Sequence, residues 1–187
     1  MINNLHILFL TVIIVSCINT AVVKIPEKIV DSESTYLKRD GKYVLFKNQK
    51  LSGYVRQINS NRSMISIVGY LNGRKENIEK IWYQNGKISE IRYYKEGKKV
   101  GKHELFWENG NKKMVAYFVD GEHHGKMDQW HENGVFYKRF NYKNGHEVGN
   151  QRIWNNKGII KSNYDVINGR RYGLTGIMNC RSVANEF

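Results

Sequence analysis

Glycine recurs at a fixed period in this 187-residue chain, and the period limits the folds open to it. Gly86, Gly110, Gly134 and Gly158 are spaced 24 residues apart. Other columns keep that spacing: Trp82, Phe106, Trp130 and Trp154 before these glycines, then Gly97, Gly121, Gly145 and Gly169, then Gly101, Gly125, Gly149 and Gly173. A repeat of this size predicts a protein whose units bury their apolar faces by stacking on their neighbours.

Each unit is predicted to be a β-hairpin. Asn85-Gly86, Asn109-Gly110 and Asn133-Gly134 are typical of a two-residue type I′ turn, whose central residues both need positive φ. A second turn per period is expected at Glu96-Gly97, Asp120-Gly121, Asn144-Gly145 and Asn168-Gly169. Apolar and polar residues alternate between the turns, which is the pattern of half-buried strands. The predicted fold class is therefore all-β: an antiparallel hairpin meander with a period of 24 residues.

Aromatic residues fall at fixed columns of the repeat, so they are expected to pack. One column contains Phe46, Tyr70, Tyr94, Phe118, Tyr142 and Val166. The column that begins at Trp82 is expected to be the spine of the core, rather than a platform on which bases stack. Nucleic acid is accordingly not expected as a partner.

The N-terminus predicts export. Residues 1–16 carry no charged side chain and end in an apolar run of signal-peptide length. Ile14-Val15-Ser16-Cys17 resembles the lipobox of bacterial lipoproteins, which implies removal of the signal helix and lipidation of Cys17. An ordinary cleaved signal and an uncleaved anchor are the alternatives. The expected location is the cell envelope, with the chain lipid-anchored to a bacterial membrane on its periplasmic or outer-membrane side.

The rest of the chain divides into two parts. Residues 17–38 contain Pro26, the sole proline, and no repeat column, so they are expected to be the lipidated cysteine and a linker. Residues 39–187 are expected to form the β-repeat domain with a terminal cap, and its first strand is predicted around Lys42 to Phe46.

No arrangement of residues predicts an active site. Cys180 has no base or orienting group beside it in sequence, and a buried or incidental cysteine is expected. The spacings of His103, His123, His124, His131 and His146 match no zinc motif, although a chance pair on adjacent strands stays open. The chain is predicted not to be an enzyme and to need neither cofactor nor metal. An enzyme would instead depend on one residue whose loss is fatal without unfolding.

Four segments carry a family resemblance: Tyr-x-Asn-Gly-Lys at residues 83–87, Tyr-x-x-Gly-Lys at 94–98, Gly-Lys-x-x-x-Phe-Trp-Glu-Asn-Gly at 101–110 and Gly-Lys-x-x-x-Trp-x-Glu-Asn-Gly at 125–134. They resemble the variant MORN (membrane occupation and recognition nexus) repeat, over roughly residues 40–178. Chains of this kind, often lipoproteins, are grouped as YwqK-family antitoxin-like proteins. The resemblance implies a sheet curved into a half-pipe, no cofactor, and a role in membrane association or in binding a partner.

Charge points to an anionic partner. Thirty Lys and Arg against seventeen Asp and Glu give a formal net charge of +13, and none of these charges lies in residues 1–16. Candidate contacts recur near turns and on the alternate face, and such residues are able to form a basic stripe: Lys98, Lys99, Lys102, Lys112, Lys113, Lys138, Arg139, Lys143, Arg170 and Arg171. Lysines that merely keep exposed strands soluble are the alternative.

These features predict a non-enzymatic, membrane-tethered module. Its exposed sheet face is expected to bind an unknown protein partner or the anionic head groups of a membrane surface. The alternative is an antitoxin-like protein that neutralises a toxin by direct binding, which needs a cytoplasmic form.

Overall fold

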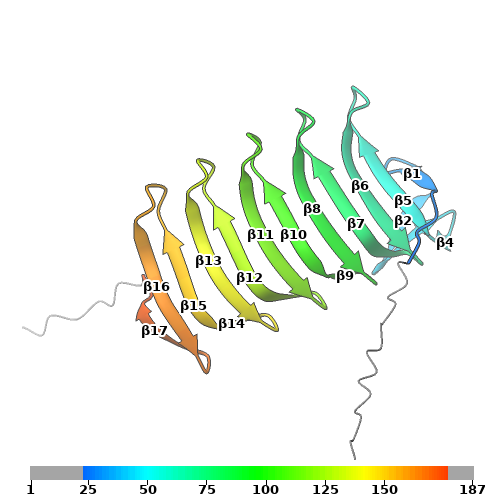
Figure 1. The fold of residues 1–187 in the computed structure, drawn as a ribbon. Coiled ribbons are helices and arrows are strands. Elements are labelled where there is room, and N and C mark those ends of the chain that lie inside the picture. Colours follow the sequence, from blue (N-terminus) through cyan, green and yellow to red (C-terminus); the bar gives the residue numbers. More distant parts are fainter. Residues whose placement is uncertain (1–22, 177–187) are drawn as a thin grey trace, which may run out of the picture.

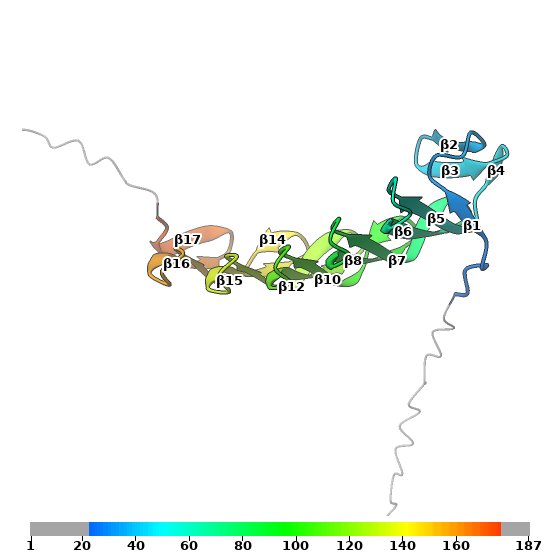
Figure 2. The ribbon, with the colours of Figure 1, turned by 90° about the horizontal axis from the view of Figure 1, so that it is seen from above.

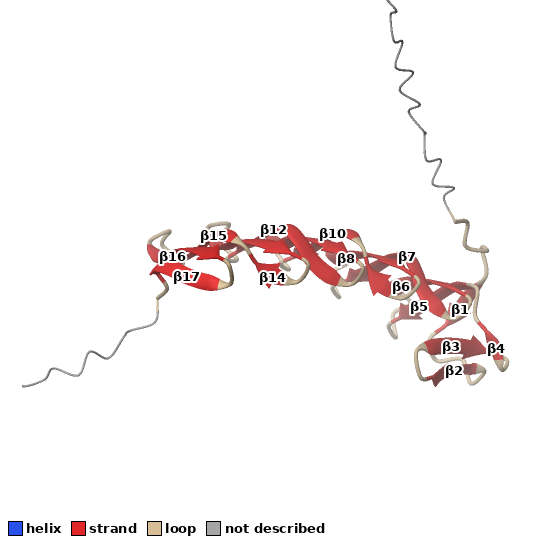
Figure 3. Cartoon of the chain, turned by 90° about the horizontal axis from the view of Figure 1, so that it is seen from below, coloured by secondary structure: helices blue, strands red, loops and turns tan. Residues whose placement is uncertain are grey.

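The computed structural model describes residues 23–176, and every regular element in that range is a β-strand (Figure 3). The strands, in chain order, are β1 (Ile29–Asp31), β2 (Leu37–Asp40), β3 (Tyr43–Phe46), β4 (Gln49–Lys50), β5 (Gly53–Ile58), β6 (Met64–Leu71), β7 (Arg74–Trp82), β8 (Ile88–Lys95), β9 (Lys98–Lys99), β10 (Gly101–Phe106), β11 (Lys112–Val119), β12 (Glu122–Trp130), β13 (Phe136–Lys143), β14 (His146–Glu147), β15 (Gly149–Trp154), β16 (Ile160–Ile167) and β17 (Arg170–Leu174). Residues 23–176 contain no helix long and apolar enough to cross a membrane.

Most strands belong to one 14-stranded sheet that is not closed (Figure 1). From β5 to β17 each strand of the main path pairs antiparallel with its neighbours, and β1 joins the sheet by pairing parallel with β5. The short strands β9 and β14 pair with β8 and β13 beside the main path. The predicted all-β antiparallel meander is confirmed.

The lower edge of the sheet in Figure 1, which we name the turn edge, is built from two-residue type I′ turns. Both central residues have positive φ in each of them, for example 50° at Glu96 and 85° at Gly97. The others are Asn72-Gly73, Asp120-Gly121, Asn144-Gly145 and Asn168-Gly169. The predicted second turn of each period is confirmed.

The opposite edge, which we name the tip edge, uses a different turn from the one predicted. Gly110 has positive φ, but Asn109 before it does not, and the same holds at Asn85-Gly86 and Asn133-Gly134. Gly110 N donates to Trp107 O at 2.8 Å, and Trp107 N donates to Asn111 O at 2.8 Å. This is a longer loop that closes on a left-handed glycine. The prediction of type I′ turns at these three dipeptides was wrong.

The two faces of the sheet differ in burial. The inner face carries the column Tyr70, Tyr94, Phe118, Tyr142 and Val166, of which Tyr142 alone is half-buried. Figure 2 shows why this single-layer sheet has buried residues: β14, β17 and the small sheet β2–β4 all lie on the same side of it. The strands bend toward that side beside glycines with positive φ at Gly101, Gly125 and Gly149.

A row of stacked rings runs across the repeats on the inner face. His103 and His123 lie on either side of Phe118, with ring centroids 4.5 and 4.3 Å away. The row continues to Tyr94, 5.9 Å from His103, and to Tyr142, 5.0 Å from His123. Two histidines therefore contribute to the packing that joins one repeat to the next.

The aromatic column that begins at Trp82 does not form the predicted spine of the core. Trp130 and Trp154 are only half-buried, and Phe136 lies between them with ring centroids 5.2 and 5.8 Å away. The sheet register shifts beside each member of the column, for instance between Gln129 and Trp130. Such β-bulges change the direction in which side chains point. This one turns Phe136 to the outer face of the sheet, which carries Trp130 and lies opposite the face that carries Phe118.

Neighbouring repeats are also joined at both edges by hydrogen bonds. On the turn edge, Gly97 N donates to Lys75 O at 2.8 Å, and Gly121 N donates to Lys99 O at 2.9 Å. On the tip edge, Trp107 Nε1 donates to Trp130 O at 3.1 Å, and Tyr83 Oη donates to Phe106 O at 2.7 Å. Each repeat therefore orients the turns of the next one.

The N-terminal end departs from the predicted boundaries. Strand β1 falls within the segment expected to be a linker, and Val30 in β1 is buried. Residues 37–50 form a separate three-stranded sheet, β2–β3–β4, instead of the first repeat of the meander. Val44 from this sheet packs with Val30, Leu51 and Tyr70 in one core cluster. The long-range contacts of β1 and β3 with β5 and β6 explain both differences.

Candidate anion-binding surface

The candidate basic residues separate into groups on different parts of the sheet. Lys98, Lys99, Lys143, Arg170 and Arg171 all lie within three residues of a turn glycine on the turn edge. Two of them point to the inner face: Lys99 Nζ is 5.1 Å from the centre of the Phe118 ring, and Arg171 lies 5.1 Å from the Tyr164 ring. The turn edge is therefore basic, although it is not basic at every repeat, since Glu122 and Glu147 follow two of its turns.

Lys102 and Lys112 lie together on the outer face. They line a groove of about 310 Å³ with Lys126, and its floor contains Val115, Tyr117 and Trp130. Asp128 is the acidic residue of this lining. We name this feature the outer groove. Its lining contains three lysines, from β10, β11 and β12, and a tyrosine that is 43% exposed.

The remaining candidates pack on aromatic rings. Lys113 Nζ is 4.4 Å from the centre of the Trp107 ring at the tip edge, and Lys138 Nζ is 4.9 Å from the Tyr137 ring. Arg139 lies 4.4 Å from the Phe136 ring on the outer face. These contacts are favourable cation–π arrangements, so part of each side chain is committed to the fold.

Ion pairs divide the candidates further. Four carry a carboxylate partner: Lys98 with Asp120 at 3.3 Å, Lys102 with Glu104 at 2.7 Å, Arg139 with Asp128 at 2.9 Å and Arg171 with Glu147 at 3.0 Å. The hydrogen bond from Lys102 to Glu104 raises the pKa of that lysine. Among residues 23–176, Lys112 and Lys126 form no ion pair, and both side chains are exposed.

The candidate basic residues therefore do not form one continuous stripe in the structure. It brings together Lys102 and Lys112 in the outer groove, and a separate row along the turn edge. Lys126 belongs to the outer groove but was absent from the candidates. The signal that finds it is strand pairing: β12 lies next to β11, and Lys126 and Asp128 point to the same side as Val115 and Tyr117.

His103, His123 and His131 contribute to the fold, whereas His124 and His146 are exposed. His103 is 2% exposed, and its Nε2 lies 3.0 Å from Tyr93 O. Burial lowers the pKa of His103, and burial followed by the Lys99 charge lowers the pKa of His123. His123 Nδ1 is buried without a hydrogen-bond partner among the described residues. His131 Nε2 lies 3.2 Å from Trp154 O, and in residues 23–176 no cluster of three His, Cys, Asp or Glu residues is placed to hold a metal ion.

Two sequence-predicted residues lie outside the described residues. Cys17, the expected lipidation site, belongs to residues 1–22, and Cys180 belongs to residues 177–187. Comparison of the chain with protein-family models and with curated proteins finds no match to either. The resemblance to the variant MORN repeat therefore stays a prediction.

Proposed function

We propose that this chain is a non-enzymatic repeat module that is tethered to a membrane through Cys17 and binds an anionic membrane surface with the outer face of its sheet. The observation that carries the proposal is the outer groove, in which Lys102, Lys112 and Lys126 surround the half-exposed Tyr117. On the inner face, the stacked rings pack against one another and the sheet β2–β4 covers one end. Less of that face is therefore available to bind a partner.

The chemistry of the outer face suits a lipid interface. Tyrosine is enriched where membranes meet water, because its ring is apolar and its hydroxyl is hydrated. Tyr93 and Tyr117 occupy the same repeat column, are 38% and 43% exposed, and present such rings one period apart. Lysines beside them add roughly 1 kcal/mol each near an anionic surface, an effect that extends over about one Debye length.

The open shape of the sheet supports the same proposal. The 14-stranded sheet extends in one direction without closing, so its outer face approaches a planar surface over several repeats at once (Figure 2). Contacts of this kind add up along the sheet, and each one is weak. Single substitutions are therefore expected to have small effects and combined ones large effects.

Co-sedimentation with vesicles tests the proposal. Residues 18–187, which lack Cys17, are expected to bind phosphatidylglycerol vesicles at low salt and to dissociate from them at high salt. They are not expected to bind phosphatidylcholine vesicles. The double variant Lys112→Gln/Lys126→Gln is expected to bind about 30-fold more weakly, since two lysines contribute about 2 kcal/mol.

The matched control is Lys47→Gln/Lys157→Gln, which removes the same charge away from the outer groove. Equal loss in both variants means that net charge alone drives binding, and the outer groove is then not the site. Absence of binding to either vesicle leaves Cys17 as the sole proposed attachment and redirects the search to an acidic protein partner, including a toxin.

A further inference from the structure

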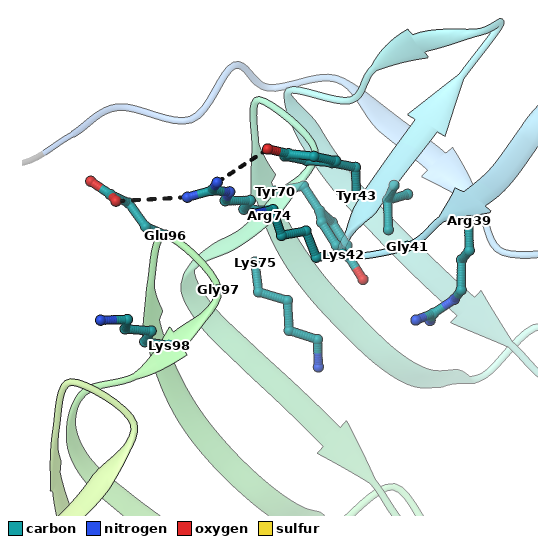
Figure 4. Close-up of a pocket in the computed structure, with 11 residues that line it drawn as sticks. Arg39, Gly41, Lys42, Tyr43, Tyr70, Arg74, Lys75, Glu96, Gly97 and Lys98 are labelled. Carbon is teal, nitrogen blue, oxygen red and sulfur yellow. Dashed lines mark hydrogen bonds and ion pairs between the residues drawn. The ribbon is translucent and has the colours of Figure 1, made fainter.

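A cavity lies where the sheet β2–β4 covers the turn edge of the long sheet. Its volume is about 430 Å³, and the buried side chains of Val44 and Tyr70 form its floor. Five basic residues line it: Arg39 from β2, Lys42 from the β2–β3 turn, Arg74 and Lys75 from β7 and Lys98 from β9. Figure 4 shows that Arg39 and Lys75 come from opposite sides of this space. We name it the junction cavity.

The walls of the junction cavity are held by backbone contacts. Val44 N donates to Gly73 O at 2.8 Å, and Gly73 N donates to Leu51 O at 2.7 Å. A Cβ on Gly73 would lie 3.0 Å from Val44 O and 3.3 Å from Tyr43 Cβ, so glycine permits this close approach. The two sheets are thus joined beside the cavity, and its shape does not depend on side-chain contacts alone.

Two of the cations are oriented before any ligand arrives. Arg74 donates to Tyr43 Oη at 3.1 Å and lies 3.9 Å from the Glu96 carboxylate, as the dashed lines in Figure 4 show. Lys75 Nζ donates to Glu79 at 2.7 Å and lies 4.7 Å from the centre of the Tyr94 ring. Groups fixed in this way lose little freedom when they bind a ligand.

The charge of the junction cavity is not balanced from within. Glu96 is the acidic residue of its lining, and Lys98 is paired with Asp120 outside it. Arg39 and Lys42 form no ion pair among residues 23–176, so two cations remain for a ligand.

The cavity is specific to this end of the molecule. The turn Asn168-Gly169 is also followed by two basic residues, Arg170 and Arg171, but a Cβ built on Gly169 meets no atom within 4 Å. In the described part of the chain, the first turn of the series is the one that a second sheet covers. The cavity is thus a product of β2–β4 and not of the repeat itself.

We propose that the junction cavity binds a small molecule that carries a phosphate group. Guanidinium groups match phosphate oxygens with paired donors, and lysine adds point charges around them. The volume lies in the range of small-molecule sites and exceeds what one phosphate fills. The phosphate belongs either to a free metabolite or to a lipid head group, and the two sources are separated by experiment.

Calorimetric titration of the full chain in nonionic detergent with inorganic pyrophosphate tests this inference. The double variant Arg39→Gln/Lys42→Gln is expected to lose about tenfold or more in affinity, because it removes the two unpaired cations. Both side chains are exposed, so folding should be preserved, which circular dichroism verifies. The control Lys112→Gln/Lys126→Gln, on the outer face, is expected to bind within about twofold of the original chain.

A second titration uses detergent micelles that contain phosphatidic acid. Binding to these micelles but not to pyrophosphate, lost in the Arg39/Lys42 variant, assigns the phosphate to a lipid. Equal weakening of pyrophosphate binding in both double variants, or binding of neither probe, overturns the inference. This result is independent of the vesicle experiment, since the outer-groove variant tests that proposal and leaves the junction cavity unchanged.

Discussion

From β7 to β16 the chain repeats one hairpin, and the strand ends at the turn edge bend over the inner face of the sheet (Figure 2). At the N-terminal end, from β1 to β6, the second sheet β2–β4 covers that face instead. The repeats bury rings that stack from one unit to the next, including His103 and His123. The N-terminal end buries a compact aliphatic cluster around Leu51. The repeat thus supplies a continuous surface, while the junction cavity needs an element outside the repeat.

The largest loss of stability is expected for Leu51→Ala, at the N-terminal end of the molecule. Leu51 is 2% exposed and packs in the cluster that joins the two sheets, so its truncation is expected to cost about 2–5 kcal/mol. Hydrogen exchange is expected to lose protection in β1–β6 while the amides of β11–β13 keep theirs, because repeats are stabilised by their nearest neighbours. Uniform loss across the whole sheet would mean that the two regions unfold as one unit.

The paired substitutions Gly73→Ala and Gly169→Ala compare equivalent turns with and without a second sheet beside them. Both glycines have positive φ, 78° and 75°, so each alanine is expected to cost about 1 kcal/mol in backbone strain. At Gly73 the new Cβ also crowds Val44 O, whereas at Gly169 nothing lies within 4 Å. Urea unfolding should show a loss of about 2 kcal/mol or more for Gly73→Ala. Equal losses would show that the sheets separate easily at this point.

Asn109→Ala tests the edge contacts between repeats. Asn109 Oδ1 accepts from Asn111 N at 2.8 Å, and Asn109 Nδ2 donates to Glu132 O at 3.1 Å. Loss of these exposed bonds is expected to cost about 0.5–1.5 kcal/mol in unfolding free energy. Asn61→Ala, at the exposed loop between β5 and β6, serves as the control and should change stability little. A larger effect at Asn61 would contradict the importance of the repeat contacts.

The smallest effect expected is a pH dependence confined to the repeats. The pKa values of His103 and His123 are lowered in the folded state, so below pH 6.5 the unfolded chain binds more protons than the folded one. The stability that these two groups contribute is full above that pH and falls as pH drops through 6.5, until the folded-state pKa is passed. Urea midpoints on either side of that pH measure this change. His103→Gln/His123→Gln should flatten it, and an unchanged slope would assign it to other groups.

The period, the strands and the antiparallel order follow from the sequence because each hairpin repeats the same local chemistry. The type of each turn could not be predicted in this way, because the dipeptide Asn-Gly is compatible with more than one kind of loop. The number of residues between the paired strand ends decides the type: Trp82 pairs with Ile88 across five residues, while Lys95 pairs with Lys98 across two. A two-residue loop of type I′ requires positive φ at both positions, and here Glu96 adopts it.

The tip edge keeps the five-residue spacing from one repeat to the next. Phe106 pairs with Lys112 across five residues, and Trp130 pairs with Phe136 in the same way. Each of these pairs also adjoins a shift in the sheet register, which depends on how two strands meet and not on the residues of the loop. The distance between paired residues, and not the dipeptide, therefore separates the two edges of the sheet.

The placement of the basic residues could be predicted only in part. Strand alternation assigns most side chains to a face, but the bulge beside Phe106 disturbs it and leaves Lys112 in the outer groove with Lys102. The junction cavity was beyond sequence reasoning, because it depends on long-range packing of Val44 against Tyr70. Residues that lie outside the repeat columns show no sequence pattern that predicts this contact.

The bonds that link each turn glycine to the preceding repeat also have a mechanical meaning. Gly97, Gly121 and Gly145 each donate to a carbonyl 22 residues earlier in the chain, at Lys75, Lys99 and His123. Tension applied along the sheet therefore has to break these bonds before one repeat separates from the repeat that precedes it. Each released repeat of 24 residues supplies about 80 Å of fully extended chain, so extension is expected to proceed in regular steps.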